Sequence, residues 1–349
     1  MKHLCLTKKS WIETEEYMKI LFFGEPLIRI TPSHYSPLKN EANCHLYYGG
    51  SEVNIASNLS GFGISTSFFT GLPNHTVGLS FIDYLKSLQI DTSNIALTGE
   101  RIGTYYLING YGCRGSDVYY DRKNTSISDI NLNSINMDVL FKDITHFHFS
   151  GITVAVSENV RKILLTLLNE AKKRNIIVSI DLNLRTKMIS VEDAKKRFSQ
   201  FAKYADYCFG IDPIMSDDNN MEMFDRINAT EEKIKKRMKA LIDTYHFKAL
   251  FHTVRSVDEN MINNYKSYAY SDKFYHSVEL KTSLLERVGS GDAYVAGALY
   301  GIMNGLSIQD TINIAVASGT YKCTILGDNM FEPISKITQL LKTNSEISR

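Results

Sequence analysis

Four residues near the end of the chain, Gly289-Ser290-Gly291-Asp292, combine a flexible backbone with one acidic side chain. The glycines let the backbone approach a ligand closely, and the small residues that follow predict a helix beginning at this loop. Amide N–H groups in the first turn of a helix lack backbone partners and bind anions. Asp292, in that turn, could accept a proton from a hydroxyl group that attacks phosphorus. The spacing also fits an Asp N-cap beside a tight turn, and it leaves both interpretations open.

Strand and helix patterns alternate along most of the chain. Short apolar runs predict strands, and segments with apolar residues at helical spacing predict helices. Because strands that alternate with helices pair in parallel through crossover connections, the pattern predicts an open, doubly wound α/β sheet that is mostly parallel. The expected strands are 19–23, 67–70, 146–149, 176–180, 207–209 and 249–253, and the expected helices are 52–59, 78–88, 158–174, 191–201 and 231–245.

Two segments interrupt this alternation. Residues 34–50 and 103–121 carry the glycines and alternating tyrosines of an antiparallel ribbon. We expect them to form a small β-sheet lid, within about 27–50 and 98–125, over one end of the main domain. Exposed edges of such ribbons tend to pair, which is consistent with a homodimer through the lid.

The remaining pattern indicates one folding unit, residues 18–349, because it contains no long linker, repeat or low-complexity segment. The first predicted strand follows Met18 directly. Residues 1–17 are then either a disordered extension or a short surface helix, and the sequence does not decide between them. They lack the apolar stretch of a signal peptide.

Composition excludes several classes of protein. The 349 residues include 39 Lys and Arg and 38 Asp and Glu, and a net charge of +1 gives no sign of a nucleic-acid-binding protein. No run approaches the roughly 18 apolar residues of a membrane span. Five scattered cysteines without a CxxC pair favour reduced thiols in a cytoplasm over a disulfide framework or a structural zinc site.

Common nucleotide-binding motifs are missing or out of context. Gly110, Gly112 and Gly115 match GxGxxG, but tyrosine-rich strand patterns on both sides predict a hairpin turn instead of a dinucleotide-binding fingerprint. An oxidoreductase would rest on that match alone. The sequence has no GxxxxGK[ST] loop and no HRD or DFG string, which argues against a P-loop NTPase and a protein kinase.

The glycine loop and its small-residue helix resemble the C-terminal signature of the ribokinase-like (PfkB) carbohydrate kinases. Residues 49–56, GGSEVNIA, are similar to the N-terminal signature of that family, and residues 322–328 resemble its late nucleotide-side segment. The likeness extends from about 18 to 338. It implies the family's fold, a carbohydrate substrate, ATP and Mg²⁺ as cofactors, and Asp292 as general base. It also implies that the amides of Gly289, Ser290 and Gly291 stabilise the transferred phosphoryl group.

Several strings look like the 2-keto-3-deoxygluconate kinases within that family. They are GEPLIR at 24–29, RIGTYYL at 101–107, VYYDR at 118–122, HFSGIT at 148–153 and DLNLR at 181–185. The resemblance implies a sugar acid as substrate, whose carboxylate Arg122 and Arg185 could bind through charge-assisted contacts. The remaining substrate contacts that it implies are Gly50, Ser51, Asn54, Tyr105 and Tyr120. Either arginine could instead be solvated or support the fold, and the tyrosines could serve ordinary ribbon packing.

The nucleotide side is less specific, and here the sequence departs from the family. The resemblance implies nucleotide contacts from Thr253, Arg255, Gly289 and Gly291, with Thr253 to Arg255 ending a strand. Where many members carry Asn-x-x-Glu near magnesium, this chain has Asp212 as the nearest carboxylate, so we name no metal ligand. Glu286-Arg287 replaces the usual Asp-Thr before the glycine loop, which puts a monovalent-cation site in doubt.

The expected function is therefore ATP-dependent phosphorylation of a sugar acid, most simply 2-keto-3-deoxygluconate to its 6-phosphate. One alternative is another kinase of the same family, of the fructokinase or ribokinase type. Another is a non-catalytic sugar- or nucleotide-binding homologue. The sequence does not distinguish the gluconate from the galactonate epimer.

Overall fold

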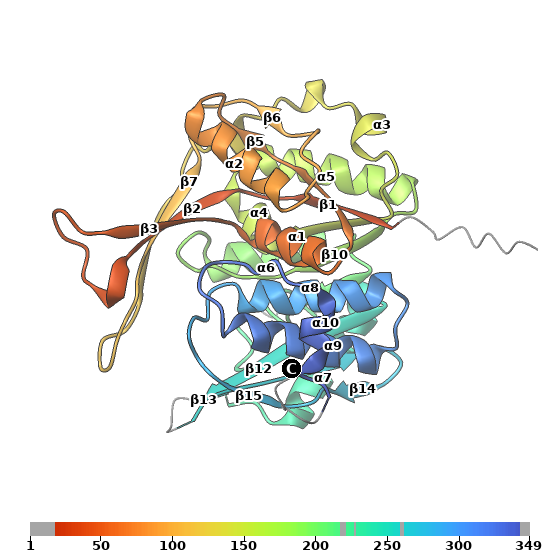
Figure 1. Ribbon diagram of the computed structural model, residues 1–349. Helices are drawn as coiled ribbons and strands as arrows, with labels where there is room; N and C mark the ends of the chain where they lie inside the picture. The colour runs from red at the N-terminus through yellow and green to blue at the C-terminus, as the bar shows by residue number, and fades with distance from the viewer. Residues whose placement is uncertain (1–17, 217–220, 227, 259–261, 343–349) are drawn as a thin grey trace, which may run out of the picture.

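A nine-stranded β-sheet runs through both halves of the computed structural model (Figure 1), which describes residues 18–216, 221–226, 228–258 and 262–342. Its strands are β1 (Lys19–Phe23), β4 (Ser65–Phe69), β9 (His146–Ser150), β10 (Ile177–Asp181), β11 (Tyr207–Phe209), β12 (Ala249–Val257), β13 (Ile262–Tyr270), β14 (Phe274–His276) and β15 (Leu280–Ser283). The order is β14-β13-β12-β11-β10-β9-β1-β4, with β15 paired to β13. The pairs from β4 to β12 are parallel and those of β13 are antiparallel, so the predicted mostly parallel α/β fold is confirmed.

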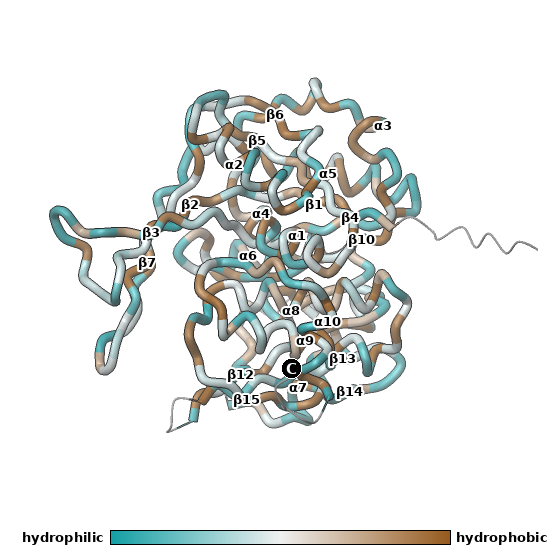
Figure 2. The backbone as a smooth tube through the Cα atoms, in the orientation of Figure 1, coloured by the Kyte–Doolittle hydropathy of each residue, from teal (hydrophilic) through white to brown (hydrophobic). Residues whose placement is uncertain are grey.

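Helices cover both faces of this sheet. One face packs against α5 (Glu158–Lys173), α6 (Val191–Ala202) and α7 (Glu231–Tyr245). The other packs against α1 (Ser51–Gly61), α2 (Thr76–Ser87), α8 (Ser290–Met303), α9 (Ile308–Lys322) and α10 (Ile334–Gln339). Strand β1 shows why both faces are apolar: Leu21 and Phe23 join one core while Ile20 and Phe22 join the other. In Figure 2 hydrophobic and hydrophilic residues alternate along the strands and helices of the body.

A separate four-stranded sheet forms the lid and projects from one side of the body (Figure 1). It contains β2 (Leu27–Pro32), β3 (Cys44–Gly49), β7 (Gly103–Ile108) and β8 (Asp117–Asp121), in the order β3-β2-β7-β8. The two outer pairs are antiparallel as expected, but β2 and β7 pair in parallel, because both leave the body in the same direction. The glycines of the GxGxxG match lie in the turn between β7 and β8, which confirms a hairpin.

One expected strand end is wrong. β12 continues past Thr253 to Val257 and pairs with β13, so Arg255 lies within a strand and not at its end. The antiparallel partner β13 supplies the hydrogen bonds that extend the strand beyond Thr253. Residues 1–17, for which the sequence left two interpretations, lie outside the described residues.

The remaining elements are short. They are β5 (Gly71–Leu72), β6 (Ala96–Leu97), α3 (Met137–Leu140), α4 (Gly151–Val156) and the 3-10 helices Ser33–Tyr35, Ser126–Asp129 and Leu132–Ser134. No helix within the described ranges is both long enough and apolar enough to cross a membrane.

Candidate active site

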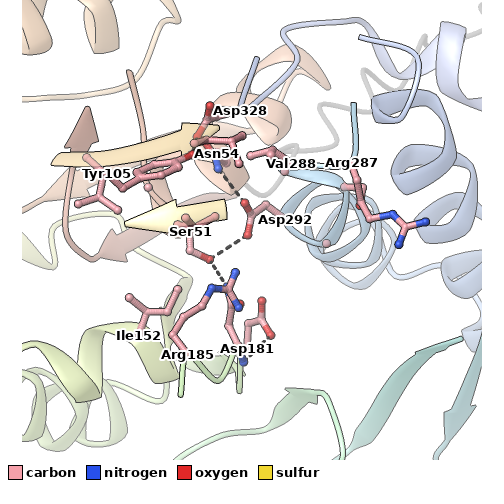
Figure 3. Close-up of a pocket in the computed structure, with 18 of the residues that line it drawn as sticks. Ser51, Asn54, Tyr105, Ile152, Asp181, Arg185, Arg287, Val288, Asp292 and Asp328 are labelled. Atoms are coloured by element: carbon pink, nitrogen blue, oxygen red, sulfur yellow. Dashed lines mark hydrogen bonds between the residues drawn. The ribbon is translucent and has the colours of Figure 1, made fainter. Parts of the chain in front are cut away.

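A pocket of about 310 Å³ opens where the lid, the start of α1, the carboxyl end of β10 and the glycine loop before α8 meet (Figure 3). Ligands of open α/β sheets commonly bind at the carboxyl ends of parallel strands. The pocket is lined by all the predicted site residues except Thr253: Gly50, Ser51, Asn54, Tyr105, Tyr120, Arg122, Arg185, Arg255, Gly289, Ser290, Gly291 and Asp292. Residues from both ends of the sequence therefore share one site.

Asp292 stands in the first turn of α8, and two side chains of α1 hold its carboxylate. Ser51 Oγ donates to Oδ1 at 2.9 Å, and Asn54 Nδ2 donates to Oδ2 at 2.7 Å. Figure 3 shows these two bonds converging on the carboxylate from one side of the pocket. Gly289, and not Asp292, is the N-cap of α8, and it makes no side-chain capping bond. The capping interpretation of Asp292 is therefore wrong.

Opposing effects set the proton affinity of Asp292. Burial raises its pKa above the usual value, while the hydrogen bonds from Asn54 and Ser51 and the positive charges of Arg185 and Lys322 lower it. The hydrogen bonds and charges favour the carboxylate form that a base needs, and burial makes that carboxylate more basic than one in water.

The glycine loop needs Gly289 for its shape. Gly289 has φ 76°, and a Cβ there would lie 1.7 Å from the carbonyl oxygen of Asp328. Gly291 has open space instead, with nothing within 4 Å of the position of a Cβ. Room beside Gly291 and the unpaired amides of the first helical turn suit an anionic group.

One part of the anion-site prediction needs correction. The Ser290 N–H donates to the Arg287 carbonyl at 3.1 Å and so closes the turn before α8. It is not free to bind a phosphoryl group. The Ser290 hydroxyl is itself an acceptor for Arg255 Nη1 at 3.2 Å, which links the loop to β12.

The two predicted carboxylate-binding arginines have different surroundings. Arg122 is 6% exposed and donates from Nε to Glu25 Oε2 at 2.9 Å, with a second contact from Nη2, while the Thr125 hydroxyl donates to Oε1 of the same Glu25. Arg185 is exposed at the pocket, and its Nη1 donates to the Leu184 carbonyl at 3.2 Å. Arg185 makes no ion pair within the described part of the chain, whereas the charge of Arg122 is largely balanced by Glu25.

A buried charge cluster lies behind the pocket wall. Tyr105 donates its hydroxyl to Oδ2 of Asp328, whose Oδ1 lies 3.0 Å from Nε of Arg29. Arg29 also binds Glu286 through Nη1 at 2.5 Å. The Tyr105 hydroxyl is therefore already engaged, and its ring, 6.2 Å from that of Tyr120, forms a wall of the pocket.

Sequence reasoning missed four polar residues of the pocket, namely Asp181, Asn183, Arg287 and Asp328. Burial, with the nearby charge of Asp292, raises the pKa of Asp181 to about 7. Asn183 Nδ2 donates to Ser51 Oγ at 2.9 Å and so extends the hydrogen-bond chain that ends at Asp292. Asp181 and Asn183 belong to the DLNLR string, so their position beside Arg185 was the signal that could have identified them.

Within the described ranges, no carboxylate cluster takes the place of the missing Asn-x-x-Glu. Asp212 is buried away from the pocket, 3.2 Å from Nζ of Lys195 and 3.7 Å from Nη2 of Arg237, so it serves the fold. Among the residues that the structure describes, no group of three His, Cys, Asp or Glu side chains could hold a metal ion. This donor set fits an ion carried mainly by nucleotide phosphates and water.

Known proteins resemble this chain over most of its length. The pfkB family of carbohydrate kinases matches residues 18–333. A 2-dehydro-3-deoxygalactonokinase of Haloferax volcanii is 23% identical over 89% of this chain and 92% of its own length. A 5-dehydro-2-deoxygluconokinase of Clostridium perfringens is 25% identical over 88% of both chains. The crystal structure of 2-dehydro-3-deoxygluconokinase from Thermotoga maritima superposes with a TM-score of 0.85 and 28% identity, covering 93% of this chain and 98% of that one.

Proposed function

The chain belongs to the pfkB family of carbohydrate kinases, and from that premise we propose that it transfers the γ-phosphoryl group of ATP to a hydroxyl group of a sugar acid. The first candidate substrate is 2-keto-3-deoxygluconate, phosphorylated at its 6-hydroxyl. Its galactonate epimer and the 5-keto isomer follow from the names of the related kinases.

One observation carries the choice of a sugar acid: Arg185, an exposed arginine that pairs with no acidic residue among those the structure describes, shares the pocket with Asp292. A neutral sugar offers no negative charge to such a group. Arg122 adds donors that Glu25 leaves unused, because a guanidinium has five N–H groups and Glu25 accepts from Nε and Nη2. The carboxylate would bind at this arginine side, and the reacting hydroxyl would point to Asp292.

The proposed step moves one proton and one phosphoryl group. Asp292 accepts the proton of the substrate hydroxyl while the hydroxyl oxygen forms a bond to the γ-phosphorus. The bond from that phosphorus to the β-γ bridging oxygen breaks and releases ADP. Ser51 and Asn54 hold the Asp292 carboxylate toward the hydroxyl. The amides of Gly289 and Gly291 face the charge that develops on the phosphoryl oxygens.

The nucleotide would lie on the side of the glycine loop away from the lid. Arg255 and the open space at Gly291 are suited to phosphates there. Mg²⁺ bound to those phosphates neutralises part of their charge. The lid would exclude water from the two reactants and so limit hydrolysis of ATP.

An ATP-consumption screen tests this proposal. The purified full chain is assayed with Mg²⁺ and each of five compounds: 2-keto-3-deoxygluconate, its galactonate epimer, 5-keto-2-deoxygluconate, fructose and ribose. We expect kcat/KM to be at least about 100-fold higher for one of the acids than for either neutral sugar. Preference for fructose or ribose would support the other family kinases instead. Binding without turnover of any compound would support a non-catalytic homologue.

A further inference from the structure

Lys322 is a lysine with no exposed surface at the end of α9, directly behind the glycine loop. Lysine is rarely buried unless it is paired. Its Nζ donates to the Ile325 carbonyl at 2.9 Å, and within the described ranges it forms no ion pair. Beyond its effect on the pKa of Asp292, the step proposed above gives Lys322 no role, so its buried position needs an explanation.

The contact between Lys322 and the loop is close. A Cβ on Gly289 would lie 3.4 Å from Cε of Lys322 and 1.7 Å from the carbonyl oxygen of Asp328. The lysine stem and the Asp328 backbone therefore pack against Gly289. Since Gly289 is the N-cap of α8, these contacts also fix the position of the first turn of α8 and of Asp292.

We propose that Lys322 is a positioning residue of the phosphoryl-transfer site, whose buried ammonium supports the glycine loop from behind and supplies fixed positive charge to Asp292 and to the anion site. The proposal rests on the kinase function proposed above. It assigns to Lys322 a role that no residue lining the pocket can fill, because a cation on the pocket side is exposed to the substrate.

Arg185 and Lys322, the cations that lower the pKa of Asp292, differ in their exposure to the substrate. Arg185 faces the pocket, and a bound sugar carboxylate would neutralise it. Lys322 is shielded from both reactants by the loop, so its charge remains when the site is full. A permanent charge in a buried region acts more strongly than one in water and needs no rearrangement during the reaction.

The other charges around these groups are consistent with this arrangement. Desolvation lowers the pKa of Lys322 below its usual value, and Arg29 lowers it further, while Glu286, Asp328 and Cys323 favour its charged form. On the side of Asp292, the carboxylates of Glu52, Asp181 and Asp328 oppose its ionisation. Tyr105 and Tyr265 are the neutral titratable groups that interact with Asp292. Lys322 thus offsets an excess of acidic groups near the proposed base.

The same protein offers a matched control, a second buried lysine whose role is structural. Lys195 is also fully buried, but it pairs with Asp212 at 3.2 Å, away from the pocket. Lys195→Met should lower the melting temperature without changing the pH dependence of kcat. Lys322→Met is the same substitution at another fully buried lysine, so any difference between the two variants reflects where the lost charge lay.

The experiment compares kcat and KM across pH for the wild type, Lys322→Met, Lys322→Arg and Lys195→Met. For Lys322→Met we expect kcat to fall about 10-fold, less than the roughly 10²- to 10³-fold loss of a direct transition-state donor. We expect the acidic limb of its kcat profile to move up by roughly 0.5–1 pH unit. Lys322→Arg should keep the limb of the wild type even where kcat is lower. Lys322→Gln replaces Lys322→Met if the latter does not fold.

Two results would overturn the proposal: an unshifted acidic limb in folded Lys322→Met, or the same shift in Lys195→Met. The assay uses whichever carbohydrate the substrate screen identifies. A neutral sugar as substrate would contradict the proposed specificity, but the test of Lys322 would still apply. If no carbohydrate is turned over, the pKa of Asp292 is compared in wild type and Lys322→Met by carbon NMR, with Asp292→Asn to assign the signal. An unchanged pKa there also contradicts the proposal.

Discussion

Asn54 and Asp292, 238 positions apart in the chain, are joined by a hydrogen bond of 2.7 Å from Nδ2 to Oδ2. Asn54 is fixed in turn by Asn329, whose Nδ2 donates to Asn54 Oδ1 at 3.4 Å, and Asn329 is bound by the Tyr84 hydroxyl. The bond therefore belongs to a chain that connects α1, α2 and the segment after α9. It ties the two family signatures to one carboxylate.

Asn54→Ala should make Asp292 a poorer base at neutral pH. The Asn54 hydrogen bond lowers the pKa of Asp292, so its loss raises that pKa. Because the base must be unprotonated, activity is present above this pKa and lost as pH falls through it, and the acidic limb of kcat moves to higher pH. A hydrogen bond to a charged group contributes about 1.5–3 kcal/mol, so we expect kcat at pH 7 to fall by roughly 10-fold or more.

The matched control is Asn58→Ala, one turn further along α1. Asn58 is fully buried and accepts the Met330 N–H at 2.9 Å, but it does not contact Asp292. Its loss should lower stability and leave the pH profile in place. Identical profiles for the two variants would contradict the assigned role of Asn54.

Alanine at the two loop glycines should separate folding from ligand binding. Gly289→Ala forces a side chain into a left-handed backbone against the Asp328 carbonyl, so it should lower the free energy of unfolding by at least about 1–3 kcal/mol. Gly291→Ala meets no protein atom within 4 Å and should melt like the wild type. Its methyl group would occupy space intended for phosphate, so its affinity for ATP should fall. Calorimetry checks the stabilities and a nucleotide titration checks the affinities. Normal ATP affinity in Gly291→Ala would contradict the binding of phosphate beside Gly291.

Replacing Arg185 by methionine should reduce activity on the sugar acid, whereas replacing Arg122 by methionine should reduce the stability of the fold. Arg185→Met removes an exposed charge, so the protein should keep its melting temperature while kcat/KM for the sugar acid falls roughly 10- to 100-fold. Arg122→Met leaves Glu25 buried without its partner, at a cost of about 3–5 kcal/mol in the free energy of unfolding. Arg122→Met combined with Glu25→Gln should recover much of that stability. Unchanged kcat/KM for the acid in Arg185→Met would contradict a carboxylate contact there.

Local patterns were sufficient for elements with strong periodicity. β1, β11 and α7 have the bounds that their apolar runs and helical spacing predict. The glycine loop and α1 were identifiable because their functions depend on residue type and short spacing. β13 was missed because polar residues interrupt its apolar pattern, and its pairing with β12 supplies the hydrogen bonds that hold it.

Contacts between distant segments were beyond sequence reasoning. Arg122 has the residue type of a carboxylate ligand, but nothing near it in the chain indicates that Glu25, 97 positions away, balances its charge. The same holds for Glu286, which appeared as a departure from a motif and proves to be the partner of Arg29 in a buried cluster. Burial and long-range pairing decide such cases, and both arise only when the sheet and the lid assemble.

The most direct test of the account is the turnover of Asp292→Asn with the preferred acid, measured beside substrate binding. Asparagine keeps the shape of the side chain but cannot accept a proton as a carboxylate does. We expect kcat to fall by about 10²- to 10⁴-fold, as for the loss of a general base, while the dissociation constants of the acid and of ATP change less than about threefold. A variant that retains turnover within about tenfold of the wild type would contradict the role of Asp292 as the base.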